Sequence, residues 1–367
     1  MEDRKIRVAI THGDTNGIGY EVILKAFEDP VMLELCTPII YGAPKVAAFH
    51  RKAMQLETPY TIIKNAEEAH ADKLNLLATF DDELKVEFGQ PTEESAQAAR
   101  KALARAKEDL QKRLFDVLVM GPVQPATGPA KEDKALTVMV SDRVRIGLVT
   151  THLPIKEVAQ AITTEKIAEK GRILHTSLKR DFRISNPRIA VLALNPQPGT
   201  EEEQIIAPAV AEMENQGIQA YGPYAADEFF GNEYYGDFDG VLAMYDDQGN
   251  VPFKTLSLEY GVKLKAGISA VCTTPDHGPE FDIAGKGVAD EQSLRHAIYT
   301  AIDMFRHRRE YDEPMGNPLP KLYHERREEG EKARFAVNCK YSKGERAYKE
   351  TYNGNGFCDN NCLPPYG

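Results

Sequence analysis

The sequence predicts an α/β protein with a doubly wound, largely parallel sheet, and two observations support that fold class. Apolar runs typical of buried strands alternate along residues 5–308 with segments of helical periodicity, which is the order that produces parallel βαβ units. Several of these runs end in polar residues; the clearest is Val241–Gly249, where a strand-like run meets two adjacent carboxylates. In such sheets, ligands bind beside the carboxyl ends of the strands.

The N-terminal part starts with a strand at Lys5–Ile10, a glycine-rich turn at 11–19 and a helix from about Tyr20 to Phe27. Three glycines permit close approach of the backbone to a ligand, and the following helix N-terminus offers N–H groups to an anion. The same turn is equally compatible with simple packing, because its spacing matches neither a Walker loop nor the dinucleotide fingerprint. Further strands are predicted at Thr37–Gly42 and Asp116–Met120, and helices at Lys45–Met54 and Glu93–Lys112.

The C-terminal part repeats this alternation. Strands are predicted at Leu136–Val140, Ile146–Thr151, Ile189–Leu194, Val241–Met244 and Gly267–Cys272, and helices at Lys156–Ala161, Thr164–Lys179, Glu201–Asn215 and Glu291–Arg308. If the ends of the three middle strands lie side by side, His152, Gln197 and Asp246 face one cleft. From Tyr311 onward prolines, glycines, asparagines and charges replace any apolar period, which predicts a polar tail with little core of its own.

Length and charge restrict the class of protein. A chain of 367 residues exceeds the size at which one core usually stops growing, so two domains are expected. The net charge of -11 argues against nucleic-acid binding, which needs basic patches. No apolar run approaches the ~20 residues of a membrane span, and the N-terminus lacks a signal-peptide core. The expected location is the cytoplasm.

Several stretches together resemble the 4-hydroxythreonine-4-phosphate dehydrogenase family of vitamin B6 biosynthesis. They are Thr11–Asp14 with Gly17–Gly19, Thr150–Pro154, Leu194–Pro196, Ala243–Tyr245 with Asp247–Gly249, Asp276–Gly278 and Ile283–Gly287. These motifs occur in the family's order across about residues 5–308, and the tail lies outside the resemblance.

The resemblance implies a two-domain subunit like the isocitrate and isopropylmalate dehydrogenases, with parallel or mixed sheets and an interdomain cleft. Residues 1–130 plus 268–312 would form one α/β domain, residues 131–267 the second, and residues 313–367 the tail. It also implies a homodimer that oxidises a small phosphorylated hydroxy-amino acid with NAD, assisted by a divalent metal, and then decarboxylates it. The metal would polarise the substrate hydroxyl and the carbonyl that forms from it.

The resemblance also assigns site residues. The family's three metal-binding histidine positions correspond here to His152, Gln197 and Asp246. A substrate-contacting lysine corresponds to Lys254, whereas an asparagine and an arginine position hold Lys263 and Cys272. Asp247 and Lys254 are the catalytic candidates. The family's Gly-His-Thr motif has no counterpart in the shortened segment at 124–144.

Each of these residues also has a structural interpretation. Asp247 either orients a neighbouring ligand or caps a turn, and His277 is either a turn histidine or a residue on the cofactor side. Lys254 is a phosphate contact or an ordinary surface lysine. One histidine, one aspartate and one glutamine favour Mg or Mn over Zn, and would bind metal more loosely than three imidazoles.

Two functions therefore remain open. In the first, the protein is a dehydrogenase of this family with an altered metal and substrate pocket. In the second, it is a diverged relative that keeps the fold and the dimer as a binding or regulatory protein.

Overall fold

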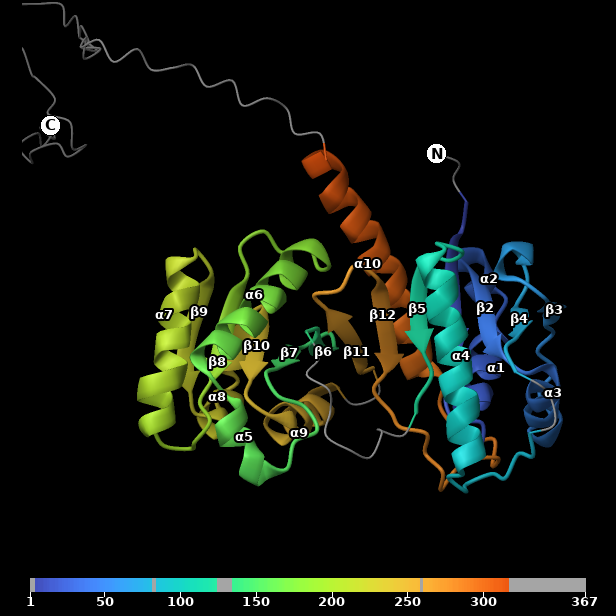
Figure 1. Ribbon diagram of the computed structural model, residues 1–367, viewed down its shortest axis with the longest axis horizontal. Coiled ribbons are helices and arrows are strands. Elements are labelled where there is room, and N and C mark those ends of the chain that lie inside the picture. The colour runs from blue at the N-terminus through green and yellow to red at the C-terminus, as the bar shows by residue number, and fades with distance from the viewer. Residues whose placement is uncertain (1–3, 81–83, 124–133, 258–259, 317–367) are drawn as a thin grey trace, which may run out of the picture. The chain divides into compact units, whose positions relative to one another are not determined.

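A twelve-stranded mixed sheet runs through the protein in the order β3-β4-β2-β1-β5-β12-β11-β6-β7-β10-β8-β9 (Figure 1). The computed structural model describes residues 4–80, 84–123, 134–257 and 260–316. The strands are β1 Ile6–Thr11, β2 Cys36–Gly42, β3 Thr61–Ile63, β4 Asn75–Ala78, β5 Val117–Met120, β6 Leu136–Val140, β7 Arg145–Leu148, β8 Arg188–Leu192, β9 Gln219–Tyr224, β10 Gly240–Ala243, β11 Val262–Ala266 and β12 Val271–Pro275. The predicted α/β class is confirmed.

Helices cover both faces of this sheet. They are α1 Gly19–Ala26, α2 Val31–Leu35, α3 Pro44–Ala53, α4 Glu93–Gln111, α5 Ile155–Ala161, α6 Thr164–Arg180, α7 Ala207–Asn215, α8 Ala226–Gly231, α9 Asp246–Ser257 and α10 Gln292–Gly316. Short 3₁₀ turns lie at Ala66–Glu68 and Tyr234–Asp237, and a π-helical turn at Glu202–Ile206 precedes α7. Side chains of α1, α6, α7 and α10 join the core on one face, whereas those of α4 belong to a cluster on the other face.

The middle of the sheet differs from its two wings. The outer strands pair in parallel, but β12, β11, β6 and β7 are successive antiparallel neighbours. Strands of residues 1–130 and 268–312 lie on one side of the β12–β11 boundary, and strands of residues 131–267 lie on the other. All described residues nevertheless fall within one compact unit, Met1–Pro318. The division into two domains stays a prediction, and the predicted tail beyond residue 316 lies outside the described residues.

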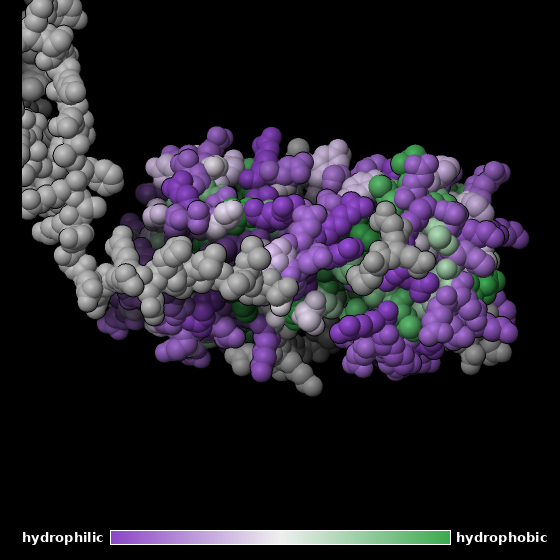
Figure 2. Space-filling model, turned by 90° about the horizontal axis from the view of Figure 1, so that it is seen from above, coloured by the Kyte–Doolittle hydropathy of each residue, from purple (hydrophilic) through white to green (hydrophobic). Residues whose placement is uncertain are grey.

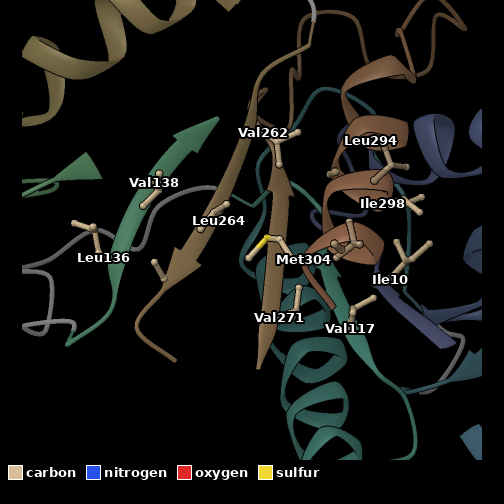
Figure 3. Close-up of a cluster of buried hydrophobic side chains, with 14 of the residues drawn as sticks. Ile10, Val117, Leu136, Val138, Val262, Leu264, Val271, Leu294, Ile298 and Met304 are labelled. Carbon is tan, nitrogen blue, oxygen red and sulfur yellow. The ribbon is translucent and has the colours of Figure 1, made fainter. Parts of the chain in front are cut away.

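The hydrophobic core against β11 determines the direction in which the lysine side chains of this strand point. Val262 and Leu264 of β11 are buried and point to the face on which α10 places Leu294 and Ile298 (Figure 3). Successive strand residues point to opposite faces. The alternate β11 residues, Lys263 and Lys265, are therefore directed away from this core.

Apart from elements that were not predicted, such as β9 and β11, two differences from the sequence prediction lie near the strand ends. The segment after Asp246 is the helix α9, although it contains Gly249 and Pro252, which weaken a helical signal. The strand expected at Gly267–Cys272 is shifted to β12, because Gly267 has a φ of +82° and forms the turn from β11. The outer surface is mostly hydrophilic in the view of Figure 2, and no helix among the described residues is long and apolar enough to cross a membrane.

Candidate active site

The main candidate site is a cavity of about 470 Å³ above the antiparallel middle of the sheet. Its walls come from the ends of β5, β7 and β12, from β6 and β11, and from α9. Four residues predicted for the site line it: His152, Lys254, Lys263 and Cys272. The structure therefore collects most of the predicted substrate residues around one space, which is within the usual size range of small-molecule sites.

Three lysines give this cavity its charge. Lys254 reaches it from α9, and Lys263 and Lys265 reach it from β11. The Lys263 Nζ lies 2.8 Å from Asp276 Oδ1, and both side chains are largely shielded, with 28% and 13% of their surface exposed. The Lys265 Nζ donates a hydrogen bond to Thr137 Oγ1 at 3.0 Å. The cations outnumber the carboxylates among the described lining residues, as a site for an anionic substrate requires.

Cys272 lies on the cavity wall as a small neutral side chain. It is 7% exposed, and burial raises the pKa of its thiol, although the positive charges of Arg308, Lys107 and Lys265 oppose that change. A protonated thiol is a weak hydrogen-bond donor and carries no charge. Cys272 thus lines the cavity, but it cannot supply the charge-assisted contact of an arginine.

A smaller cavity of about 280 Å³ adjoins the first and shares Lys254, Asp276 and His277 with it. Its other polar lining comes from the carboxylates of Glu280 and Asp290 and the hydroxyl of Ser293. The His277 Nδ1 contacts the carbonyl oxygen of its neighbour Gly278 at 3.0 Å, and its Nε2 has no hydrogen-bond partner among the described residues.

Side chains of helix α1 bind the backbone just before Asp290, a residue that lines the smaller cavity. Glu21, which is 1% exposed, forms an ion pair with Lys25 at 2.9 Å and accepts a hydrogen bond from the Ala289 backbone at 2.8 Å. Lys25 donates to the carbonyl oxygens of Gly287 and Ala289. These contacts fix the backbone immediately before Asp290.

His152 and Asp246 are brought together at the ends of neighbouring strands. β7 and β10 pair in parallel, and the His152 Nδ1 lies 4.0 Å from Asp246 Oδ2. His152 has a φ of +57°, an uncommon conformation for a residue with a Cβ, and its backbone N–H donates to the Asp246 carboxylate. The imidazole is 63% exposed, so it is accessible to a ligand.

Gln197 lies on the loop after β8, which is the other neighbour of β10. This loop is held by Glu202, whose buried carboxylate accepts hydrogen bonds from the backbones of Leu194, Asn195 and Gly199. Burial raises the pKa of Glu202, but these hydrogen bonds outweigh it and the pKa lies below its usual value. The Gln197 side chain is exposed. The three expected metal positions therefore follow adjacent strands, and Gln197 as a ligand stays a prediction.

Asp247 is placed differently from the other candidates. It is exposed in the first turn of α9, where a carboxylate is favoured by the positive end of the helix dipole. It is not among the described residues that line either cavity. Its catalytic role stays a prediction.

The glycine-rich turn after β1 serves close packing. A Cβ at Gly17 would lie 2.5 Å from the Pro279 carbonyl oxygen, and one at Gly13 would lie 2.4 Å from that of Pro122. The backbone N–H of Ile18 donates to Pro279 O at 3.0 Å. Of the two interpretations of this turn, the packing one matches the contacts. The turn positions the Pro122 and Pro279 segments, which line the main cavity.

Sequence reasoning missed several lining residues. Lys265, Thr137 and Asp276 all lie on or directly after the middle strands. The signal for the lysines was the alternation in Val262–Ala266, in which charged and apolar residues alternate with the period of a strand. No group of three or more histidines, cysteines and acidic residues suited to a metal occurs in the part of the chain that the structure describes.

Comparisons with known proteins agree with this architecture. The family model described as pyridoxal phosphate biosynthetic protein PdxA matches residues 34–128 and 127–301. A 4-hydroxythreonine-4-phosphate dehydrogenase of Bacteroides thetaiotaomicron is 49% identical, over 91% of this chain and 98% of the relative. One from a Sulfurihydrogenibium species is 34% identical, over 81% and 98%. The structure of a putative 4-hydroxythreonine-4-phosphate dehydrogenase from Salmonella typhimurium is 27% identical with a TM-score of 0.70, over 83% of this chain and 100% of that chain.

Proposed function

Because the chain belongs to the family of the pyridoxal phosphate biosynthetic protein PdxA, we propose that it is a 4-hydroxythreonine-4-phosphate dehydrogenase. It would oxidise the hydroxyl of this phosphorylated hydroxy-amino acid with NAD, after which the product loses carbon dioxide. The observation that carries the proposal is the lysine-lined cavity, which joins His152 and Lys254 in one space. A phosphorylated amino acid needs such cations for its anionic groups.

The alternative, a catalytically impaired binding or regulatory relative, is not favoured. The Bacteroides relative named as a dehydrogenase is 49% identical and covers 91% of this chain. The described cavity also keeps the cations that a dehydrogenase of a phosphorylated substrate requires. The proposal therefore takes the protein as an enzyme.

The residues at the strand ends supply carboxylate oxygen and one imidazole nitrogen, which are both ligand types of divalent cations, and His152 Nδ1 and Asp246 Oδ2 lie 4.0 Å apart. His152 and Asp246 would hold the ion, with Gln197 as the third ligand, and Mg or Mn suits this set better than Zn. When bound, such an ion polarises the oxygen of the reacting hydroxyl.

The smaller cavity offers groups that the ribose of NAD would need. Carboxylates commonly accept hydrogen bonds from the ribose hydroxyls of this cofactor, and Glu280 and Asp290 line the cavity together with the Ser293 hydroxyl. Lys254 borders both cavities. It would therefore orient the substrate next to the cofactor by binding an anionic group.

The experiment measures NAD reduction with 4-phosphooxy-threonine as substrate, by the absorbance at 340 nm. Mg, Mn and Zn are added in separate assays. Turnover above that seen with unphosphorylated threonine derivatives is the expected result. A Lys254→Met variant should lose most of it, whereas Lys156→Met, which removes an 80% exposed lysine, should not. Equal rates with phosphorylated and unphosphorylated substrates would contradict the proposal.

We further propose a cytoplasmic homodimer. The family resemblance motivates the dimer, and the biosynthetic role that the family's description names motivates the cytoplasm. Sedimentation at micromolar concentration should give about twice the chain mass of 40.9 kDa. A single species with the mass of one chain would contradict the dimer.

A further inference from the structure

We propose that Asp276, paired with Lys263, is the residue that selects an amino acid as the substrate of the main cavity. Lys263 binds the α-carboxylate of the substrate, and Asp276 binds its α-ammonium. This inference rests on the proposed function and names the residues that recognise the amino-acid end of that substrate. Asp276 is not among the site residues predicted from the sequence.

Asp276 is the one carboxylate among the described residues that line the main cavity. The lysines on the same wall attract the anionic groups of a substrate but repel an ammonium. The side chain of Asp276 is only 13% exposed, so its charge is little screened by salt and water. Among the described lining residues, an ammonium group therefore has its favourable place beside Asp276.

The pair of Lys263 and Asp276 matches the charges of an α-amino acid. The Lys263 Nζ lies 2.8 Å from Asp276 Oδ1, and this oxygen is buried. None of the described residues donates a hydrogen bond to Asp276 Oδ2, and a carboxylate accepts through both of its oxygens. An α-amino acid carries one ammonium and one carboxylate on the same carbon. When it lies head to tail against the protein pair, each of its charges meets the opposite charge.

The backbone around Asp276 holds its side chain in place. The Asp276 N–H donates to the Ser293 hydroxyl and to the Gly261 carbonyl oxygen, both at 3.2 Å, and the Ser293 hydroxyl donates to the same carbonyl at 2.9 Å. A Cβ on Gly261 would lie 3.0 Å from the Asp276 Cβ. Lys263 is held by β11, where it lies opposite Thr274 of β12. The two charges are thus positioned before a substrate binds, which lowers the cost of binding.

Asp276 also lies where the two cavities meet, because it lines both of them. In a 3-hydroxy amino acid, the carbon that is oxidised is the neighbour of the carbon that carries the ammonium. An ammonium held by Asp276 therefore keeps the reacting carbon close to the smaller cavity, the proposed place of the NAD ribose. The phosphate is left to the other lysines that line the main cavity.

The experiment is calorimetric titration of the full chain with two ligands that lack the reacting hydroxyl. O-phosphohomoserine carries the phosphate, the α-carboxylate and the α-ammonium, whereas 4-phosphooxybutanoate is the same molecule without the ammonium. NAD is titrated separately. Because neither phosphorylated ligand has a hydroxyl to oxidise, the measurement does not depend on turnover.

The variants are Asp276→Asn, Asp276→Glu and Lys263→Met. Asp303→Asn is the matched control, because Asp303 is an exposed aspartate in a surface ion pair on α10. Thermal unfolding of each variant checks that it is folded. The double variant Lys263→Met with Asp276→Asn removes both charges together, so it leaves no shielded charge unpaired and serves if a single variant does not fold.

The unaltered protein should bind O-phosphohomoserine about 10-fold to 100-fold more tightly than 4-phosphooxybutanoate, the range expected for one charge-assisted hydrogen bond. Asp276→Asn and the double variant should reduce this preference to under about threefold, and Asp276→Asn should not weaken 4-phosphooxybutanoate. Lys263→Met should weaken 4-phosphooxybutanoate, whose carboxylate depends on the lysine. Asp276→Glu should keep part of the preference and Asp303→Asn all of it. NAD affinity should be unchanged throughout.

Equal affinity of the unaltered protein for the two phosphorylated ligands, or no measurable binding of either, would overturn the inference. An equal loss of both ligands in Asp276→Asn would also overturn it, because a merely structural residue gives that pattern. A loss of NAD affinity in Asp276→Asn would do the same, since the carboxylate would then serve the cofactor. Failure of NAD reduction with 4-phosphooxy-threonine would reject the proposed function alone, because the titrations need no turnover.

Discussion

Acid should destabilise this protein through two buried histidines next to the glycine-rich turn. His12 and His50 are both 0% exposed. His12 stacks on Tyr20 with ring centroids 5.0 Å apart, and neither of its ring nitrogens has a hydrogen-bond partner among the described residues. The pKa of His12 is lowered from 6.5 to about 3, mainly by burial and also by the charge of His50, while the Gly13 backbone opposes this to a smaller extent.

His50 behaves in the same way. Burial lowers its pKa from 6.5 to about 4, against a smaller opposing effect of its hydrogen bond with the Thr15 carbonyl oxygen. Both imidazoles are therefore neutral in the folded protein and become protonated first in the unfolded chain. The unfolded state binds more protons below pH 6.5, so the free energy of unfolding falls as the pH is lowered from about 6.5 towards the folded pKa values.

The size of the effect follows from the linkage slope. Each pH unit in this window costs about 1.4 kcal/mol per histidine, so His12 alone removes about 2 kcal/mol between pH 6.5 and 5. His12→Phe keeps an aromatic ring against Tyr20 and cannot be protonated. Its stability should therefore fall by about 2 kcal/mol less than that of the unaltered protein over this interval.

Urea unfolding at pH 7.5, 6.5, 5.8 and 5.0 measures this difference directly. A matched control is His296→Phe, which makes the same substitution at a partly exposed histidine on α10. Parallel stability curves for His12→Phe and the unaltered protein would refute the reasoning, since they would mean that His12 is protonated equally in both states.

Three further predictions follow from other parts of the structure. The double variant Gln197→His with Asp246→His should bind Zn at least about 10-fold more tightly in calorimetry, because imidazoles bind transition metals tightly. Adding His152→Ala should abolish this gain. Equal Zn affinity in all three proteins would contradict the placement of these loops. Arg308→Met should lower the free energy of unfolding by about 3–5 kcal/mol, since it leaves the buried Asp181 carboxylate unpaired, whereas the exposed Arg306→Met should change it by under about 0.5 kcal/mol. Gly17→Ala should cost about 1–3 kcal/mol because its Cβ would meet Pro279, but Gly236→Ala, with open space around it, should be nearly neutral.

The sequence was sufficient to predict the elements whose signal is local. The helix at Glu93 begins after Thr92, whose side chain accepts from the Ser95 backbone and forms a capping box, and the long apolar periodicity beyond it fixed the helix type. The strand ends that carry His152 and Asp246 were also predicted together, because a parallel pairing of β7 and β10 places their carboxyl ends at one edge.

What the sequence could not supply was the pairing of distant segments. The helix α9 was missed because Gly249 and Pro252 oppose helix formation, while its stability comes from contacts such as the Gln248 side chain with the Met244 backbone and the Ala193 carbonyl oxygen. Lys265 was missed as a lining residue because the cavity forms where β6 lies beside β11, and no local pattern states which strand becomes the neighbour. Family resemblance located Lys263 and Cys272, and the structure showed that Lys265 and Asp276 line the same cavity.

The order of strands in the sheet has a consequence for folding during synthesis on the ribosome. β5 ends at Met120, but its neighbour β12 begins at Val271, about 150 residues later. At roughly 5–20 residues per second, synthesis of the intervening chain takes on the order of 10–30 s. During that interval β5 presents an open edge, the feature that promotes pairing with other chains. The nascent chain is therefore most vulnerable to aggregation before β12 and α10 emerge, and slowing translation across residues 121–270 should lower the soluble yield.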